Sequence, residues 1–519
     1  MTTLALAAYL SPLILIAVGL FAARMKGPRT SAALTLTHGA SVAALAIAVV
    51  IVAGVAAHGP VTSPLLGASG LGLQVRLDAL SAMMLALTGF VGWIVIRFSA
   101  TYMDGDDRHS AFMGGLCVTL GAVTFLILSG NLVQLVLGWT ATSLAIHRML
   151  LFYRTRPGAR LAARKKFLFA RIGDVVLIGA AVLMFRAFGT GEIAEITSAA
   201  ATGPVPTRAL WAACGLAIAA LLKSATFPTQ GWLTEVMETP TPVSALLHAG
   251  IINAGGFLII RFADLILASA PSMHLLAILG GASAVIGSLV MITQTSIKVS
   301  LAWSTVAQMG FMLLQCGLGA FTAAALHIVA HSLYKAHAFL TSGSVADQAR
   351  AMPKLASAPT LPMALAALGL AVAMVAVTGW LFGVTLESKP AIVTLGAILV
   401  MGLAHLMLMA AAAGSAPVTL ARTAAGAAAV AVTYFTLQWG VETLLVPTLP
   451  AAALPGPATA LLMGVFVAVF TLTALIQILA PSRRHRPGWR RAYVALRNGL
   501  YTNAMNNRIV GVPAPKTPA

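Results

Sequence analysis

The chain has 519 residues, of which 59% are hydrophobic and 9% are charged. Because soluble proteins carry about 25% charged residues, this composition excludes a soluble protein of one or several domains. Apolar runs of about 20 residues, each long enough to cross a bilayer as a helix, recur along the chain. The sequence therefore predicts an all-α polytopic membrane protein. No Gly-rich phosphate loop follows a strand, so nucleotide hydrolysis has no support.

The apolar runs predict about 15 transmembrane helices, with a range of about 14 to 16. In chain order they cover residues 4–22, 33–56, 78–99, 111–129, 132–152, 167–188, 209–226, 241–261, 274–293, 298–317, 320–344, 360–385, 391–413, 424–446 and 457–480. The first basic residue, Arg24, follows the first run instead of preceding it, which favours an uncleaved helix over a signal peptide. We assign residues 1–482 to the transmembrane domain and 483–519 to a basic cytoplasmic tail.

Basic residues predict the orientation. With the N-terminus outside, 25 of the 32 Lys and Arg residues lie on the inner side. Of the other seven, two lie within spans, Lys223 and Lys335. Five lie on the outer side: Arg76, Arg186, Arg208, Arg261 and Lys389. The positive-inside rule therefore predicts an outer N-terminus and an inner C-terminus. Topology and contact with anionic lipids explain the net charge of +19 without a nucleic-acid partner.

The segment from Arg154 to Lys166 is expected to be a basic inner surface loop or a short helix. Asp174 then lies about two turns into the next span. Beyond it, the stretch from Leu221 to Gly256 places Lys223 in an apolar helix, interrupts the chain with prolines, and opens a second apolar helix that carries His248. A charge within a span costs at least about 2.5–3.5 kcal/mol. A charge beside a broken helix is typical of ion-translocating membrane proteins, so we predict a proton or cation pathway.

His327, His331 and Lys335 follow at steps of four residues and share one face of the span 320–344. Histidine and desolvated lysine can exchange protons near neutral pH, so this face suits a proton path. Zinc fits less well, because no Asp, Glu or Cys completes a ligand set and the lysine repels a cation. Lys298 is either an inner anchor or the inner end of the path. No metal and no cofactor is expected.

The tail has aromatic and apolar residues at helical spacing among arginines, which predicts an amphipathic helix. Two interpretations stay open: the helix lies on the inner membrane surface, or it docks a soluble partner. The residues concerned are Arg483, Arg484, Trp489, Arg490, Arg491, Tyr493 and Arg497.

Long segments resemble a known family. KSATFPTQGWL, PTPVSALLHA, IKVSLAWSTVAQMGFM and HIVAHSLYKAHAFLTSGSV are similar to signature segments of the proton-translocating antiporter-like subunits of respiratory complex I and Mrp-type antiporters. LDALSAMMLALTGFVG around Asp78 and RIGDVVL around Asp174 also match, so the resemblance covers about residues 70–350. It implies two inverted five-helix bundles with the seventh and twelfth helices broken, in the bacterial inner membrane. It also implies a hydrated proton axis formed by Lys223, His248, Lys298, His327, His331 and Lys335.

The chain departs from the family pattern in two places. Thr140 stands where the family carries a glutamate after Gly-Trp, and His147, seven residues on, is a possible substitute. The twelfth span has no ionisable residue at its centre, and His405 in the next span is the nearest one. The structural alternative for His147 and His405 is an ordinary interhelical hydrogen bond.

These departures and the ending PGWRRAYVALRNGLYTNAMNNRIVG resemble one branch of the family, the DabB membrane subunits of bacterial inorganic carbon uptake complexes. That resemblance implies a large soluble zinc-binding, carbonic anhydrase-like partner (DabA-like) on the cytoplasmic side, energised by proton or sodium flow through this subunit. The alternatives are a subunit of a respiratory NADH:quinone oxidoreductase or Mrp antiporter, and a non-conducting membrane anchor. No nucleophile–base set is complete, so we expect a transporter subunit and not an enzyme.

Overall fold

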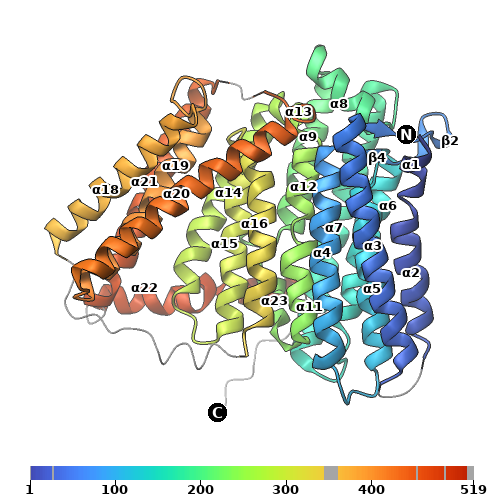
Figure 1. The fold of residues 1–519 in the computed structure, drawn as a ribbon, viewed down its shortest axis with the longest axis horizontal. Helices are drawn as coiled ribbons and strands as arrows, with labels where there is room; N and C mark the ends of the chain where they lie inside the picture. The colour runs from blue at the N-terminus through green and yellow to red at the C-terminus, as the bar shows by residue number, and fades with distance from the viewer. Residues whose placement is uncertain (1, 26–28, 344–359, 452–453, 484–486, 511–519) are drawn as a thin grey trace.

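The computed structural model describes residues 2–25, 29–343, 360–451, 454–483 and 487–510. The helices from α2 to α16 stand side by side in an upright bundle, and α18 to α21 form a slanted group at one side (Figure 1). The first half comprises α1 (Thr2–Ala7), α2 (Leu10–Ala22), α3 (Ser31–His58), α4 (Ala79–Tyr102), α5 (His109–Ile127), α6 (Leu132–Leu150), α7 (Pro157–Phe188), α8 (Ile193–Thr202) and α9 (Thr207–Lys223).

In the second half, the long helices lie between short elements at its start and at its end. It comprises α10 (Gly231–Glu235), the 3-10 turn η1 (Val236–Glu238), α11 (Thr241–Leu246), the π turn η2 (Leu247–Ile251), α12 (Ala254–Arg261), α13 (Ala263–Leu267), α14 (Ala270–Met291), α15 (Ile297–Gly317), α16 (Phe321–Leu340), α18 (Leu361–Leu381), α19 (Pro390–Ala412), α20 (Pro417–Leu445), α21 (Pro457–Arg483), α22 (Pro487–Arg497), the 3-10 turn η3 (Gly499–Tyr501) and α23 (Thr502–Ile509). The architecture is the predicted all-α membrane fold.

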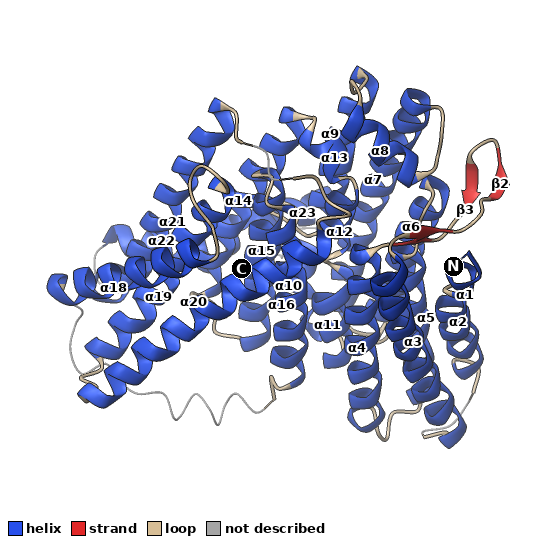
Figure 2. Ribbon diagram, turned by 45° about the horizontal axis from the view of Figure 1, so that its top comes forward, coloured by secondary structure: helices blue, strands red, loops and turns tan. Residues whose placement is uncertain are grey.

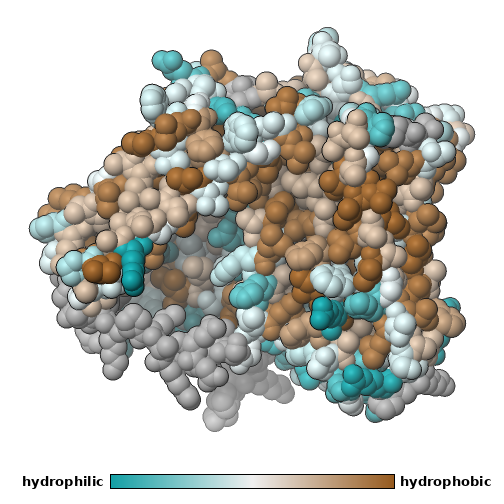
Figure 3. All heavy atoms as spheres, viewed as in Figure 1, coloured by the Kyte–Doolittle hydropathy of each residue, from teal (hydrophilic) through white to brown (hydrophobic). Residues whose placement is uncertain are grey.

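A helix covers most of every predicted span. Among the described residues, 12 helices are long and apolar enough to cross a membrane, or up to 13 if the bent pair α8 and α9 is one span. The predicted spans outside this set coincide with α6, α9 and α16, and these helices carry much of the candidate ion path. Figure 3 shows a hydrophobic side to the bundle, with hydrophilic residues gathered toward its upper and lower edges. The total of 15 spans and the orientation stay predictions.

Local sequence signals explain where several helices begin. Asp78 precedes α4, and its carboxylate accepts a hydrogen bond from the backbone N–H of Ser81 at 2.9 Å, while the Ser81 hydroxyl accepts one from the Asp78 N–H. The Asn131 side chain accepts from the backbone N–H at the start of α6. Pro157 occupies the first position of α7, where its missing N–H costs nothing. These caps fix the ends of the helices that hold the candidate site.

Four short strands lie at the edge of the bundle where the N-terminus also lies (Figure 2). They are β1 (Val61–Thr62), β2 (Leu66–Ala68), β3 (Leu71–Leu73) and β4 (Arg76–Leu77), and they pair antiparallel as β1–β4 and β2–β3. Arg76 and Arg261 both form ion pairs with the carboxylate of Asp78. The side chains of Arg261 and Asp78 are each 1% exposed. This buried ion triad joins the strands to α4 and α12.

The prediction for residues 154–166 is wrong. Pro157 starts a single helix of 32 residues, so most of the expected loop belongs to α7. Lys165 and Lys166 are buried instead of lying on the inner surface. The helix begins early because Glu238 accepts a hydrogen bond from the Ala159 N–H at its first turn.

Of the two helix breaks that the family resemblance implies, one is present and the other is not. α9 ends at Lys223, and the chain then turns through residues 224–230 into the short helix α10. A second irregularity follows in the next span, where the π turn η2 separates α11 from α12. By contrast, α18 is continuous from Leu361 to Leu381, so the break that the family resemblance implies for the twelfth helix is absent there. No Pro or polar side chain interrupts its centre.

Candidate functional site: a buried row of ionisable side chains

Lys223 lies at the end of α9, and its side chain extends toward α6. The Nζ atom donates hydrogen bonds to the carbonyl oxygen of Trp139 at 3.2 Å and to the hydroxyl of Thr142 at 3.1 Å. It also lies 4.3 Å from the centroid of the Trp139 ring, a cation–π distance. Lys223 is the last residue of α9, so its side chain lies where the chain leaves the axis of the helix.

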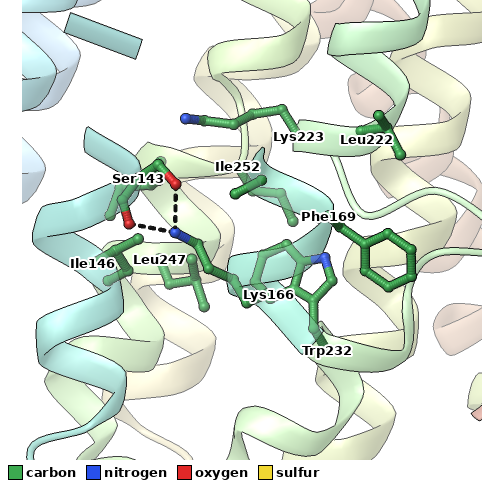
Figure 4. Close-up of a pocket in the computed structure, with 11 residues that line it drawn as sticks. Ser143, Ile146, Lys166, Phe169, Leu222, Lys223, Trp232, Leu247 and Ile252 are labelled. Carbon is green, nitrogen blue, oxygen red and sulfur yellow. Dashed lines mark hydrogen bonds between the residues drawn. The ribbon is translucent and has the colours of Figure 1, made fainter. Parts of the chain in front are cut away.

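Lys166 of α7 reaches the same part of α6 from the other side (Figure 4). Its Nζ donates to the carbonyl oxygen of Ser143 and, at 2.8 Å, to the Ser143 hydroxyl. Between the two lysines lies a cavity of about 20 Å³, lined by Ser143, Lys166, Lys223 and apolar side chains from η2 and α10. That volume is sufficient for one water molecule with polar partners. We call Thr142, Ser143, Lys166 and Lys223 the lysine cluster.

Among the described residues, no acidic side chain forms an ion pair with Lys166 or Lys223. Lys165 forms an ion pair with Glu235 at 2.7 Å, and Arg171 forms one with Asp174 at 2.7 Å. The ammonium groups of Lys166 and Lys223 contact only neutral oxygens in the hydrogen bonds described above. Two neighbouring cations with neutral partners repel each other, so holding a proton on both at once is costly.

His248 lies inside the π turn η2, which is a common position for functional side chains. Its Nδ1 is 2.9 Å from the hydroxyl of Thr305 on α15, and its ring stacks on Phe339 with centroids 4.3 Å apart. Its Nε2 is buried and has no hydrogen-bond partner among the described residues. The ring thus contacts α15 through Thr305 and α16 through Phe339.

The three residues predicted to share a face of α16 do so. Lys335 is 0% exposed, and its Nζ donates to the carbonyl oxygen of Leu301 at 3.0 Å and to the Ser304 hydroxyl at 2.9 Å. The rings of His327 and His331 stack with centroids 6.0 Å apart. Both histidine Nε2 atoms are buried without a partner in the described part of the chain. His248, His327, His331 and Lys335 form the histidine cluster.

Polar side chains flank the two clusters. Ser224, directly after Lys223, has its hydroxyl 3.4 Å from the carbonyl oxygen of Ile252, a residue that also lines the cavity of the lysine cluster. Next to it, Asn253 donates to the Ser332 hydroxyl at 2.8 Å, and its own Oδ1 is buried without a described partner. The irregular backbone after α9 and in η2 therefore lies between the clusters and supplies polar groups there.

The remaining candidates lie around this row. Asp174 pairs with Arg171, as described, at the lysine side. Lys298 of α15 donates to the hydroxyl of Thr241, at the start of α11, at 3.1 Å. Thr140 is half-buried and is not a partner of Lys223, while His147 packs against Phe167 with ring centroids 5.2 Å apart. His405 is exposed on α19 and does not line the cavity beside the histidine cluster.

The tail folds back onto the helix break. Figure 1 shows α22 below the slanted helices, running toward α23 at the lower part of the upright bundle. The Gln230 side chain donates to the Thr502 hydroxyl at 2.7 Å, Asn503 donates to Thr234 at 3.3 Å, and Asn506 donates to the carbonyl oxygen of Pro228 at 3.1 Å.

The arginine-rich part of the tail has a different environment. Arg490, Arg491, Tyr493 and Arg497 are exposed on α22, and Trp489 is partly buried. Arg483 ends α21, and Arg484 lies outside the described residues.

Sequence reasoning missed Lys166, Ser143, Thr142 and Thr305. Lys166 and Asp174 are eight residues apart, so the helical period places them on one face once α7 is taken to begin at Pro157. The serine and threonine partners carry no such signal, because hydroxyl residues are common in membrane helices. Within the ranges that the structure describes, no group of three His, Cys, Asp or Glu side chains could hold a metal ion.

Comparison with known proteins places the chain in a family. Residues 129–413 match the family model described as NADH:quinone oxidoreductase/Mrp antiporter, TM, and residues 66–113 match complex I chain 5 N-terminus. The chain is similar to the probable inorganic carbon transporter subunit DabB2 of Halothiobacillus neapolitanus, with 38% identity over 456 residues, 85% of this chain and 80% of the relative. It also resembles NADH-quinone oxidoreductase subunit L of Escherichia coli, with 35% identity over 282 residues, 54% of this chain and 46% of the relative.

The fold agrees with these matches. The structure of the Mrp complex from Dietzia sp. DQ12-45-1b aligns with a TM-score of 0.64 and 23% identity, covering 98% of this chain and 60% of that chain. The protein is thus a multi-span subunit of the bacterial inner membrane. The family model and the relatives show that the chain belongs to the complex I/Mrp antiporter-like family of membrane subunits, in the branch of the DabB inorganic carbon transporter subunits.

Proposed function

We propose that this protein conducts ions, most simply protons, across the membrane and thereby energises a soluble carbonic anhydrase-like partner in inorganic carbon uptake. The observation that carries the proposal is the buried row from the lysine cluster to the histidine cluster. Buried ionisable side chains within spans are costly and are kept where they transfer ions. Relatives named as inorganic carbon transporter subunits support the assignment to carbon uptake.

The chemistry of the row favours protons over sodium. A sodium site needs several oxygen ligands, commonly with a carboxylate, whereas this row presents lysine ammoniums and histidine nitrogens. Asp174, the acid nearest to the lysine cluster, is paired with Arg171. A proton can pass between Lys166 and Lys223 through the space for one water, because each lysine can hold or release it. The unpaired Nε2 atoms of His248 and His331 can then accept it.

The partner would bind at the inner face, where α22 and α23 lie. In this proposal residues 1–482 conduct and the tail from 483 onward connects conduction to the partner. The tail contacts Pro228, Gln230 and Thr234, which lie directly after Lys223. A partner that shifts the tail would therefore shift the helix break. The exposed arginines of α22 give the partner, or the lipid surface, a basic contact. Zinc-dependent hydration of CO2 to bicarbonate would take place in the partner.

Growth of a carbonic anhydrase-deficient host at ambient CO2 tests the proposal. The host would express this chain with its neighbouring soluble gene, as wild type, as Lys223→Ala, and as Arg186→Ala. Arg186 is exposed at the outer end of α7 and serves as the control for loss of a cation. Pull-down of the partner confirms assembly. We expect rescue by wild type and by the control, and none by an assembled Lys223→Ala complex.

Two other outcomes point to different functions. Equal rescue by assembled Lys223→Ala would leave the protein as a non-conducting membrane anchor. No rescue by any version would favour a respiratory or Mrp-type subunit, a candidate supported by the likeness to subunit L of the NADH-quinone oxidoreductase. That likeness spans 54% of this chain, compared with 85% for the DabB2 relative.

A further inference from the structure

The histidine cluster ends at a large cavity between the upright bundle and the slanted helices. His327 and His331 of α16 line this cavity of about 730 Å³, whose opposite wall comes from α19 and α20 and includes Tyr434. Gln315 of α15 also lines it, and its Oε1 is buried without a partner in the described ranges. The unpaired nitrogen and oxygen atoms of these side chains are buried behind the cavity wall, which is mostly apolar.

The polar side chains continue along one face of α20. Tyr434, Gln438 and Glu442 follow at steps of four residues, so they share a face and span about 12 Å along the helix axis. α20 packs against α16. Gln438 is 2% exposed, and its Nε2 donates to the Thr322 hydroxyl of α16 at 3.0 Å. Its Oε1 is buried and has no partner among the described residues.

The face ends at an ion pair near the outer end of the helix. Glu442 pairs with Lys389, at the start of α19, with Nζ and Oε2 2.9 Å apart. Both residues and Thr322 line a second cavity, of about 310 Å³. Thr322 thus borders this cavity on one side and binds Gln438 on the other. Lys389 is among the residues that the positive-inside rule places outside.

We propose that Tyr434, Gln438 and Glu442, with Lys389, form the outer half of the ion path, between His327 and the external surface. This inference rests on the proposed function. In this path, a proton exchanges between His327 and water in the large cavity, moves along water that is hydrogen-bonded to the Gln438 Oε1 and the Thr322 hydroxyl, and exchanges with Glu442 at the outer cavity. Each step moves one proton between neighbouring groups and forms no other bond.

This arrangement supplies the ionisable group that α18 lacks. α18 is continuous and carries no ionisable residue at its centre, so a path through that helix has no group to use. Glu442 supplies an acid in a neighbouring helix instead, beside a buried amide with an unused acceptor. A purely structural role for the ion pair, holding α19 to α20, leaves the buried acceptor atom of Gln438, which has no partner among the described residues, without an explanation.

Ion flux through the assembled complex in proteoliposomes tests the inference, with pH-sensitive and sodium-sensitive dyes as readouts. The variants are Gln438→Leu, which keeps the size and removes the amide, and Glu442→Gln, which keeps the shape and removes the charge. Glu387→Gln is the matched control, because Glu387 is an exposed acid in the loop that leads to Lys389. Lys223→Ala is measured beside them. Binding of the partner and the thermal unfolding midpoint check that every variant is folded.

We expect Gln438→Leu and Glu442→Gln each to lower the flux by roughly tenfold or more, with Glu387→Gln at the wild-type rate. Wild-type flux in folded Gln438→Leu and Glu442→Gln, together with a loss in Lys223→Ala, would overturn this inference and leave the proposed function standing. Wild-type flux in Lys223→Ala as well would instead contradict the proposed function. In a further outcome, Glu442→Gln loses flux only because it no longer folds, while folded Gln438→Leu keeps the wild-type flux. That outcome would assign the ion pair a structural role.

Discussion

The contact between the tail and the helix break makes a testable prediction about local stability. Thr502, Asn503 and Asn506 of α23 form three hydrogen bonds with the segment that follows Lys223. The triple variant Thr502→Val, Asn503→Ala, Asn506→Ala removes them all. Each uncharged hydrogen bond contributes about 1 kcal/mol, so the variant should lose about 3 kcal/mol of local stability, which is roughly a 150-fold rise in the equilibrium constant for opening.

Hydrogen exchange of backbone amides measures this opening. The amides of Thr229 and Leu233 are suitable reporters, because they donate to the carbonyl oxygens of Thr226 and Gln230 within the segment. Their exchange should accelerate by about two orders of magnitude in the triple variant. Amides in the middle of α14, which takes no part in these three hydrogen bonds, should keep the wild-type rate.

Asn498→Ala provides the control. The Asn498 side chain is exposed and donates to the Val494 carbonyl oxygen within the tail itself. Its loss should leave exchange at Thr229 and Leu233 unchanged. Unchanged exchange at these amides in the triple variant would refute the reasoning, because it would mean that the tail does not stabilise the break.

Further predictions concern the buried charges. Asp78→Asn leaves the guanidinium of Arg261 uncompensated and should destabilise the purified protein by about 3–5 kcal/mol, seen as a lower thermal unfolding midpoint; an unchanged midpoint would contradict the ion triad. Burial alone would raise the pKa of Asp78, but the Arg261 and Arg76 guanidiniums lower it to about 2. Because this folded-state pKa lies below the unfolded value of about 3.9, the contribution is fully present above about pH 4 and is lost as the pH falls toward 2. The midpoint of wild type should therefore fall more steeply over that range than that of Asp78→Asn, and parallel curves would show that Asp78 is not paired. Lys166→Met should lower ion flux by roughly tenfold or more without loss of folding, and wild-type flux would remove Lys166 from the path.

The residues whose chemistry is unusual for a membrane helix could be predicted from the sequence. Lys223, His248, His331 and Lys335 stand out in apolar runs, and the structure brings the last three into one cluster. The helix break after Lys223 was also predictable, since prolines follow it closely. Periodicity and composition carry this kind of information.

Contacts that depend on tertiary packing could not be predicted in the same way. The sequence predicts a surface loop or a short helix around Lys166, because basic runs usually lie at the membrane surface, whereas the packing of α7 against α6 buries this side chain. The π turn at His248 arises where the short segment α11 meets α12, and no local residue pattern identifies it. In the sequence, Glu442 looks like an ordinary acid near the end of a helix, because its ion pair with Lys389 depends on the packing of α19 against α20.

The most direct test of the central claim is proton flux through the purified complex in proteoliposomes, measured for wild type and for Lys223→Ala with the partner bound in both. The account predicts flux in wild type that falls by roughly tenfold or more in Lys223→Ala, while the variant keeps its unfolding midpoint. Equal flux in the two complexes, with the partner bound, would contradict conduction through the buried row.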